Sequence, residues 1–485
     1  MLSIFTYLNR EELFVSISTK RPSFWYLLHN IVFGNNAHHP ASSSNLSAVY
    51  SPRPPLDDYG AWATYWEKQG HPWRTEPEID KERQEYLAWR RKIAPDIEQA
   101  IYPFKDIHLK RADVEWLLAT HENERGPVDW NVVDQRDRAG IDVRGADLRQ
   151  ADLRGLPLAC MIGGLAMIDD LTINTGHRKQ AAVLLDGATL RRTHLEGAIL
   201  YDASVRNAAL QDSHLQEIRA RWVNMEGSRL RGADLRGADL SRSHLEGCTL
   251  KNACLDGTDL RGAFFDATSR ISTLGSKETT ALVSEVHWGE VDLTRMDWSQ
   301  VIILGDERIA KEQKSSNLRL VGLHRAVRAY RKLVAELQGQ GLNEEATRFA
   351  YRAQVLQRQV WWFEMMRPAL KLRQRMQALG AWLFSWFLFL LAGYGYKLWR
   401  SFLSYMLIII GFATVYYMLG ASFAPPLSLV NALALSMTSF HGRGFFPGVT
   451  QLNDILTLLA SIEAFVGLIL EVTFIATLTQ RFFGK

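Results

Sequence analysis

Two carboxylates inside an apolar segment are the side chains of this sequence best suited to chemistry. Glu463 and Glu471 interrupt Ile455–Thr479, which is otherwise free of charged residues. A carboxylate at the centre of a membrane span costs roughly 2.5–3.5 kcal/mol, so it normally faces protein or water. At 100° per residue, their spacing keeps them within about 80° of each other around a helix. They are therefore either part of a polar path or a pair of buried, protonated structural acids.

A glycine-containing loop, His441–Gly448, precedes this segment and reads HGRGFFPG. Gly442 and Gly444 allow backbone angles that other residues adopt only at a cost. The loop follows Pro426–Phe440, which is apolar and helix-like. We find none of the sequence signatures of common enzyme classes, and we expect no enzymatic activity and no cofactor.

Long apolar runs must position this loop. Ser401–Gly420 contains no charged residue, and as a helix it reaches ~30 Å, the thickness of the hydrocarbon layer. We predict a membrane domain over 379–485. Its elements are an interfacial helix at 381–393 that is rich in Trp and Phe, a first span at 401–420, a short helix and loop at 427–446, and a second span at 455–479.

Basic residues flank both spans on one side, at Lys397, Arg400, Arg481 and Lys485. Because positive residues stay on the cytoplasmic side, both the N-terminal domains and the C-terminus are expected in the cytoplasm. The membrane is then the inner (plasma) membrane.

The order of span, short helix, glycine loop and span resembles the two-transmembrane pore module of the potassium-channel superfamily. LSLVNALALSMTSF, HGRG and EAFVGLIL carry the resemblance, which covers about Leu398–Phe483. It implies a homotetramer in a lipid membrane, whose loop carbonyls replace the hydration shell of a permeant ion. The filter candidates are Thr438, Ser439, Phe440, His441, Gly442, Arg443 and Gly444. The candidates that line the pore or brace the filter are Glu463, Gly467 and Glu471.

The loop departs from the family's TVGYG pattern. Phe440 replaces the Thr, His441 the Val and Arg443 the Tyr. Four Arg443 side chains facing the axis would repel cations, whereas outward-pointing ones would brace the loop. Whether the pore passes cations or anions therefore stays open.

A five-residue period dominates the middle of the chain. It begins near Ile141, pauses over about 161–180, and resumes with apolar centres every five residues from 185 to 265. Thirteen of these seventeen centres are Leu, and the position two residues before each is nearly always small. Five fits neither the helix period of 3.6 nor the strand period of 2, but it fits a chain that turns a corner in each unit.

ADLRGADL at Ala233–Leu240 resembles the pentapeptide-repeat family. The resemblance implies a right-handed quadrilateral β-helix with four units per coil, which we place at 139–305. Some members mimic DNA and bind topoisomerases, which requires a strongly negative rod. Val183–Ala267 carries 12 acidic and 11 basic residues, so we expect a scaffold that senses or docks an unknown ligand or protein. His194, His214 and His244 occupy positions that hold Asp in other units, and we interpret them as surface residues rather than metal ligands.

Three other segments complete the predicted organisation. Residues 1–55 are expected to be a poorly ordered tail or linker, and 56–138 a small, mainly helical domain. A helical hairpin is expected within 306–378, on the cytoplasmic side. A net charge of +4 is too weak to argue for nucleic acid. Three scattered cysteines indicate neither a disulfide scaffold nor a metal site.

The favoured function is an ion channel regulated or assembled through its repeat domain. The alternative is a non-conducting, membrane-anchored scaffold. A soluble DNA mimic comes third, because of the balanced charge and the two spans.

Overall fold

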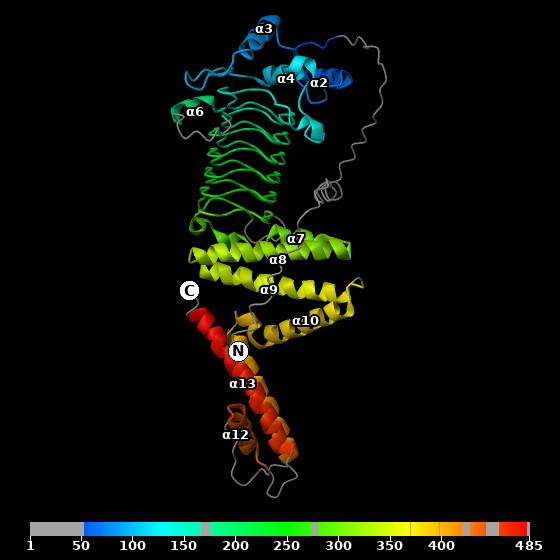
Figure 1. Ribbon diagram of the computed structural model, residues 1–485, viewed down its shortest axis with the longest axis vertical. Coiled ribbons are helices and arrows are strands. Elements are labelled where there is room, and N and C mark those ends of the chain that lie inside the picture. Colours follow the sequence, from blue (N-terminus) through cyan, green and yellow to red (C-terminus); the bar gives the residue numbers. More distant parts are fainter. Residues whose placement is uncertain are drawn as a thin grey trace. The chain divides into compact units, whose positions relative to one another are not determined.

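The computed structural model describes residues 53–165, 175–273, 280–368, 370–396, 398–420, 427–442 and 455–482 (Figure 1). The predicted tail at 1–55 lies outside them except for its last three residues. The helices of eight or more residues are α2 (Tyr59–Lys68), α3 (Lys81–Arg90), α4 (Arg111–Ala119), α7 (Gly305–Glu312), α8 (Ser316–Gly339), α9 (Asn343–Met366), α10 (Leu372–Ala392), α11 (Leu398–Gly420), α12 (Leu429–Phe440) and α13 (Ile455–Phe482).

The five-residue units wind into a coil that advances by one layer every twenty residues. Parallel bridges join Leu184 to Ser204, Ser204 to Asn224, Asn224 to His244 and His244 to Phe264. Four units therefore make one layer, as the resemblance implied. The pairs are isolated bridges between short straight segments, since the chain turns before a longer strand can form.

Two side chains from each unit fill the interior of the coil. Central residues such as Leu190 and Leu240, and small residues such as Ala188 and Ala238, are all fully buried. From Gly187 to Gly262, the second residue after each centre takes a left-handed backbone, which explains the many glycines there, including Gly187 with φ +67°. The alternation of a large and a small inward residue thus determines the coil.

Two insertions interrupt the twenty-residue layers. Asp147 pairs with Leu184, a separation of 37 residues, so the first insertion adds 37 − 20 = 17 residues. The short helix α6 (Thr175–Ala181) belongs to it. Cys254 pairs with Leu282, 28 residues on, so a second insertion adds eight. Pairing then continues to His287, beyond the last strong repeat.

The segment before the repeats covers one end of the coil. Leu109 donates its amide to the Asp147 carbonyl at 2.9 Å and extends the ladder by one rung. The Arg111 guanidinium, at the start of α4, donates to the carbonyls of Asp152 and Arg154 at 3.1 and 3.0 Å. Side chains of α4 belong to the same hydrophobic core as the repeat leucines. Helices α3 and α4 therefore share their core with the β-helix.

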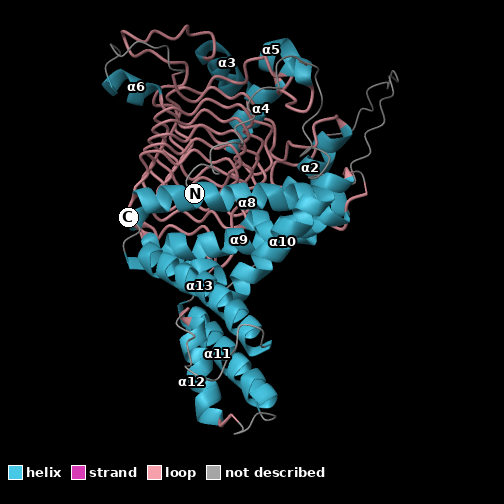
Figure 2. Cartoon of the chain, turned by 60° about the horizontal axis from the view of Figure 1, so that its bottom comes forward, coloured by secondary structure: helices cyan, strands magenta, loops and turns pink. Residues whose placement is uncertain are grey.

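Helices α7, α8 and α9 lie at the other end of the coil (Figure 1), and Figure 2 shows α8 and α9 side by side. Glu307 on α7 is fully buried, and Arg352 of α9 donates two hydrogen bonds to it, at 2.9 and 2.7 Å. Tyr330 of α8 donates a third at 2.7 Å. Burial alone would raise the pKa of Glu307, but the bonds from Arg352 and Lys311 outweigh it and lower that pKa. One carboxylate thus ties three helices together.

Helix α10 packs against α9 and is longer than the interfacial helix predicted at 381–393. It begins at Leu372, because the polar turns before the apolar run are helical as well. Arg358 of α9 lies over the rings of Trp386 and Phe389, at 4.2 and 4.4 Å from their centroids. Helix α10 also contacts α11, so packing is continuous from the repeat coil to the apolar helices.

Candidate functional site

The short helix α12 packs against both long apolar helices, α11 and α13. It starts where the Ser428 hydroxyl caps the Asn431 amide at 3.2 Å. It ends at Phe440 with His441 as its C-cap, and Gly442 follows with φ +67°, where a side chain would be strained. This places the start of the glycine loop directly at the end of α12.

Glu463 joins all three helices. Its side chain is fully buried on α13, and its Oε2 accepts a hydrogen bond from the Tyr416 hydroxyl of α11 at 2.8 Å. Its Oε1 lies against the Ser436 hydroxyl of α12, which also lies 2.9 Å from the Ile409 carbonyl. Ser436 has one proton for two acceptors, so every group is satisfied when Glu463 carries a proton itself.

Gly467 allows α13 to approach the end of α12. A Cβ atom at this position would lie 2.0 Å from the Phe440 carbonyl oxygen, far inside van der Waals contact. Phe440 is itself buried and packs edge-on against Tyr405 of α11, with centroids 4.7 Å apart. Only glycine fits at 467 with this arrangement of the helices.

His441 forms a polar cluster with Tyr405 and Glu471. Its Nδ1 lies 2.8 Å from the Met437 carbonyl, and its Nε2 lies 3.1 Å from the Tyr405 hydroxyl. The neutral tautomer that satisfies both contacts carries its proton on Nδ1. Glu471 Oε1 lies 3.6 Å from Nε2, and 39% of its side chain is exposed.

Glu471 also borders a cavity of about 300 Å³ between α11 and α13, together with Tyr405, Phe402, Leu470 and Phe474. The cavity is mainly apolar, and its polar side-chain groups are the Glu471 carboxylate and the hydroxyls of Tyr405 and Ser401. The two glutamates of α13 therefore differ in their surroundings, since one is buried and bonded and the other is open.

The filter candidates divide into described and undescribed residues. The Thr438 hydroxyl donates back to a carbonyl of its own helix, and Ser439 is buried. Phe440, His441 and Gly442 lie at the end of α12 as set out above, whereas Arg443 and Gly444 lie outside the described residues. Of the basic flanking residues, Arg400 is described, with its guanidinium 4.9 Å from the Phe389 ring centroid.

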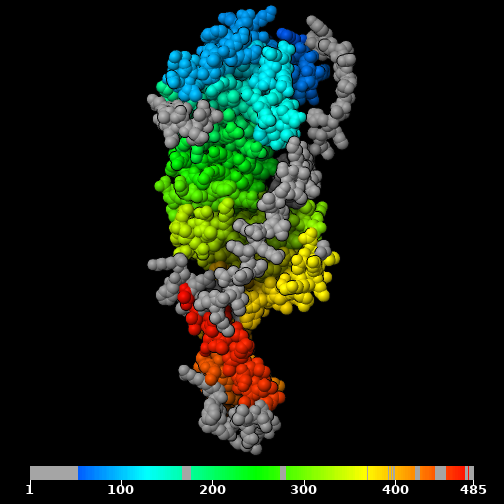
Figure 3. Space-filling model, viewed as in Figure 1, coloured from blue at the N-terminus to red at the C-terminus, as the bar shows by residue number. Residues whose placement is uncertain are grey.

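Two helices are long and apolar enough to cross a membrane, over Trp399–Gly420 and Ile455–Ile475. Most of their surface is exposed in the single chain (orange and red in Figure 3). The exposed side chains are large and apolar, for example Phe402, Leu407 and Phe465. An exposed apolar surface of this kind is typical of contact with a membrane or with another protein.

Two of the histidines that the sequence analysis interprets as surface residues belong to a polar cluster on the repeat coil. His194 and His214 lie on successive layers, and their rings stack with centroids 4.5 Å apart and planes 1° apart. Glu196 lies beside them, 3.0 Å from His194 Nδ1 and 4.0 Å from His214 Nδ1. The twenty-residue separation of the histidines was the signal, and it has meaning only once the layer length is known.

Cys248 and Cys254 of the coil have poorly ionised thiols. Burial raises the pKa values of Cys248 and Cys254 to about 12, so both stay as thiols at neutral pH. Cys248 fills one of the small inward positions and is fully buried.

The family comparison matches this fold. The model of the pentapeptide repeats matches eight copies, over residues 182–216 and 221–265. This part of the chain is therefore a pentapeptide-repeat domain, and the prediction of a β-helix is confirmed. No curated protein matches the chain.

Similar solved structures are also pentapeptide-repeat proteins. HetL of the cyanobacterium Nostoc sp., described as involved in heterocyst differentiation regulation, is 25% identical over 32% of this chain and 58% of its own, with a TM-score of 0.19. Rfr23 of the cyanobacterium Cyanothece is 26% identical over 26% of this chain and 90% of its own, with a TM-score of 0.15. QnrB1, a plasmid-mediated fluoroquinolone resistance protein, is 19% identical over 31% of this chain and 74% of its own, with a TM-score of 0.18. This chain thus spans 58% of the length of HetL.

Proposed function

We propose that the protein is a membrane ion channel of the two-transmembrane pore-loop type. Four copies surround the pore, and a pentapeptide-repeat domain in the cytoplasm regulates or assembles them. The observation that carries the proposal is the packing of α12 between α11 and α13, with Gly442 at its end. A short helix in this position points the following loop toward a shared axis in the potassium-channel superfamily.

The contacts of α12 support this assignment. Glu463 holds α12 from α13 through Ser436, and Gly467 lets α13 approach the Phe440 carbonyl. Both contacts fix the end of α12, where the loop begins. A filter requires such a rigid base, because its carbonyls must replace water around an ion with little freedom to move.

The proposed arrangement in the membrane follows from charge and aromatic residues. Arg400 marks the cytoplasmic end of α11, so both chain ends lie in the cytoplasm and the loop faces outward. Phe384, Trp386 and Phe387 are exposed on α10, and this fits a helix at the boundary between lipid and water. The partners are then the lipid of the plasma membrane, three further copies, the permeant ion and a ligand of the repeat domain, with no nucleic acid among them.

Current through the full-length protein in a planar bilayer under a KCl gradient tests the proposal. A reversal potential near that of potassium would support a cation filter, and one near that of chloride would make Arg443 the selecting residue. The double variant Gly442→Ala/Gly444→Ala should abolish the current. Gly411→Ala is the matched control, because a Cβ at Gly411 meets no atom within 4 Å.

A non-conducting, membrane-anchored scaffold is the second candidate, and one observation favours it. Phe440 stands where the family has the first filter Thr, and its side chain is buried against Tyr405 rather than free to help an ion. Silence of the wild type at all voltages, in protein that resists carbonate extraction from membranes, would favour the scaffold over the channel.

A further inference from the structure

We propose that His194, Glu196 and His214 form a binding site for a divalent transition-metal ion of the zinc class. One donor atom from each residue lies within 4.8 Å of the other two. Two imidazole nitrogens and one carboxylate oxygen are donors that Zn²⁺ prefers, and they leave a fourth position for water.

Both imidazole rings must rotate out of their stack to bind one ion, because a metal ion lies in the plane of each imidazole ring that binds it. Tetrahedral Zn²⁺ with bonds of about 2.0–2.1 Å separates its nitrogen ligands by roughly 3.3 Å. Glu196 Oε1 is already 3.0 Å from His194 Nδ1 and 4.0 Å from His214 Nδ1. The His194 and His214 side chains are 44% and 29% exposed, so both rings have room to rotate toward an ion.

The second line of evidence is the burial of the Glu196 carboxylate. Glu196 is 5% exposed, and its Oε2 is buried without a hydrogen-bond partner. A buried carboxylate with an unpaired oxygen is costly, and a cation bound at Glu196 Oε1 would lower that cost by neutralising the charge of the group. The charge of Asp129 also acts on His194, so two carboxylates make the site attractive for a cation.

The same coil contains a natural comparison. His244 and Glu246 repeat the His-x-Glu pair with a 3.1 Å contact, and Glu246 Oε2 is likewise buried without a partner. The layer after His244 offers Phe264 in place of a second histidine, and the two rings stack with centroids 4.7 Å apart. The pair at His194 differs by one added imidazole, which raises the number of metal ligands from two to three.

A metal here joins two layers of the coil. His194 and Glu196 belong to one layer and His214 to the next, so the ion links residues that the backbone ladder already holds in register. Binding to the folded coil and not to the unfolded chain would stabilise the coil by an amount that grows with the logarithm of the free metal concentration.

The test uses the full chain in detergent, stripped with EDTA and then exchanged into micromolar free Zn²⁺. Elemental analysis after gel filtration gives zinc per chain. We expect the wild type to hold one more zinc per chain than His214→Phe, which copies the stack at His244 and Phe264. His194→Gln is the second loss variant, and His244→Gln is the matched control that should keep the full zinc content.

Thermal unfolding provides the second measurement. Zinc should raise the melting temperature of the wild type and of His244→Gln, and leave that of His214→Phe unchanged. In EDTA all of these proteins should melt alike, which shows that the variants fold. Equal zinc content in the wild type and His214→Phe, or no zinc on the wild type at micromolar concentration, would overturn the proposal.

Discussion

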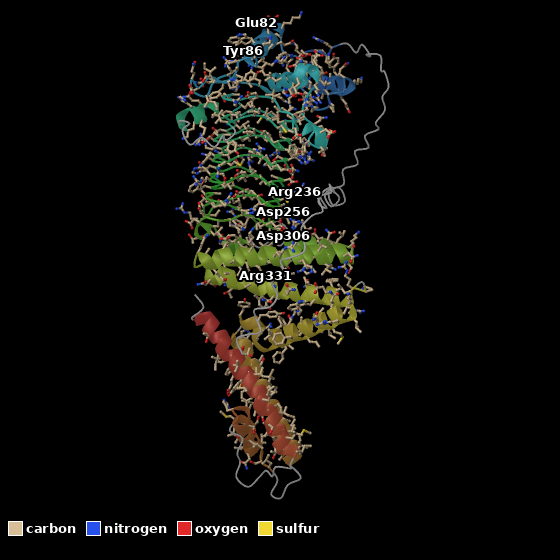
Figure 4. All side chains as sticks on the ribbon, in the orientation of Figure 1. Glu82, Tyr86, Arg236, Asp256, Asp306 and Arg331 are labelled. Carbon is tan, nitrogen blue, oxygen red and sulfur yellow. The ribbon has the colours of Figure 1, made fainter. Side chains whose placement is uncertain are left out.

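Replacing one buried carboxyl group at the end of the coil should stabilise the protein in a way that depends on pH. Asp306 lies on α7, at the junction of the repeat coil with the helices (Figure 4). Its Oδ2 accepts a hydrogen bond from the Val283 amide at 2.9 Å. Burial raises its pKa from 3.8 to about 6, against the opposing effects of that bond and of Arg325. Asn has the same shape and keeps an acceptor for the Val283 amide.

The magnitude follows from the two pKa values. The folded state binds the Asp306 proton more tightly than the unfolded chain, so stability is lost as the pH rises from about 4 to about 6. One pKa unit corresponds to 1.36 kcal/mol, so ionisation of Asp306 costs the folded state about 3 kcal/mol above pH 6. Asp306→Asn is neutral at every pH and avoids this cost.

Thermal unfolding of the full chain at pH 4, 6 and 8 measures the effect. Asp306→Asn should match the wild type at pH 4 and melt higher at pH 8, by at most about 10 °C. Asp137→Asn, at an exposed position, is the control and should match the wild type throughout. If Asp306→Asn melted lower than the wild type at pH 8, the ionised carboxylate would be stabilised by Arg325, and the reasoning would fail.

Three further substitutions test the packing. Gly467→Ala should destabilise the membrane helices by about 1–3 kcal/mol, because its Cβ would overlap the carbonyl at the end of α12. Gly411→Ala is the control and should have no effect. The melting temperature of the protein in detergent distinguishes the two variants. Leu240→Ala leaves a cavity inside the coil and should cost about 2–5 kcal/mol, measured by loss of circular dichroism on heating. Arg352→Met removes the main partner of the buried Glu307 and should cost about 3 kcal/mol, and faster hydrogen exchange in α7 and α9 would report it. A variant that melts like the wild type would contradict the corresponding contact.

The repeat coil could be predicted from the sequence because its rule is local. Each unit must place one large and one small residue inward, so the residue types in Ala233–Leu240 are enough to predict the layers of the coil. The lengths of the two insertions could not be predicted from this rule. After Phe265 the pattern weakens, and the pairings of Cys254 with Leu282 and of Asp259 with His287 show that the coil continues past an eight-residue insertion.

Contacts between segments that are far apart in the sequence could not be predicted either, but for a different reason. Hydropathy marks the apolar half of α10 but not its start at Leu372, since polar residues also form helix. The stack of His194 on His214 depends on a layer of exactly four units, with no insertion between them. Likewise, the hydrogen-bond partners of Glu463 come from two other helices, and their separation from Glu463 along the sequence follows no period.

The two glutamates of α13 have different surroundings in the structure, although their roles cannot be told apart from the sequence. Both interrupt an apolar segment, and from the sequence alone both could attract ions or both could be structural. Glu463 has each oxygen engaged, by Tyr416 and by Ser436, and has no exposed surface to offer an ion. Glu471 borders a cavity and is 39% exposed. If the protein conducts, Glu471 is therefore the carboxylate whose charge an ion would meet, and Glu463 is the one that holds the loop in place.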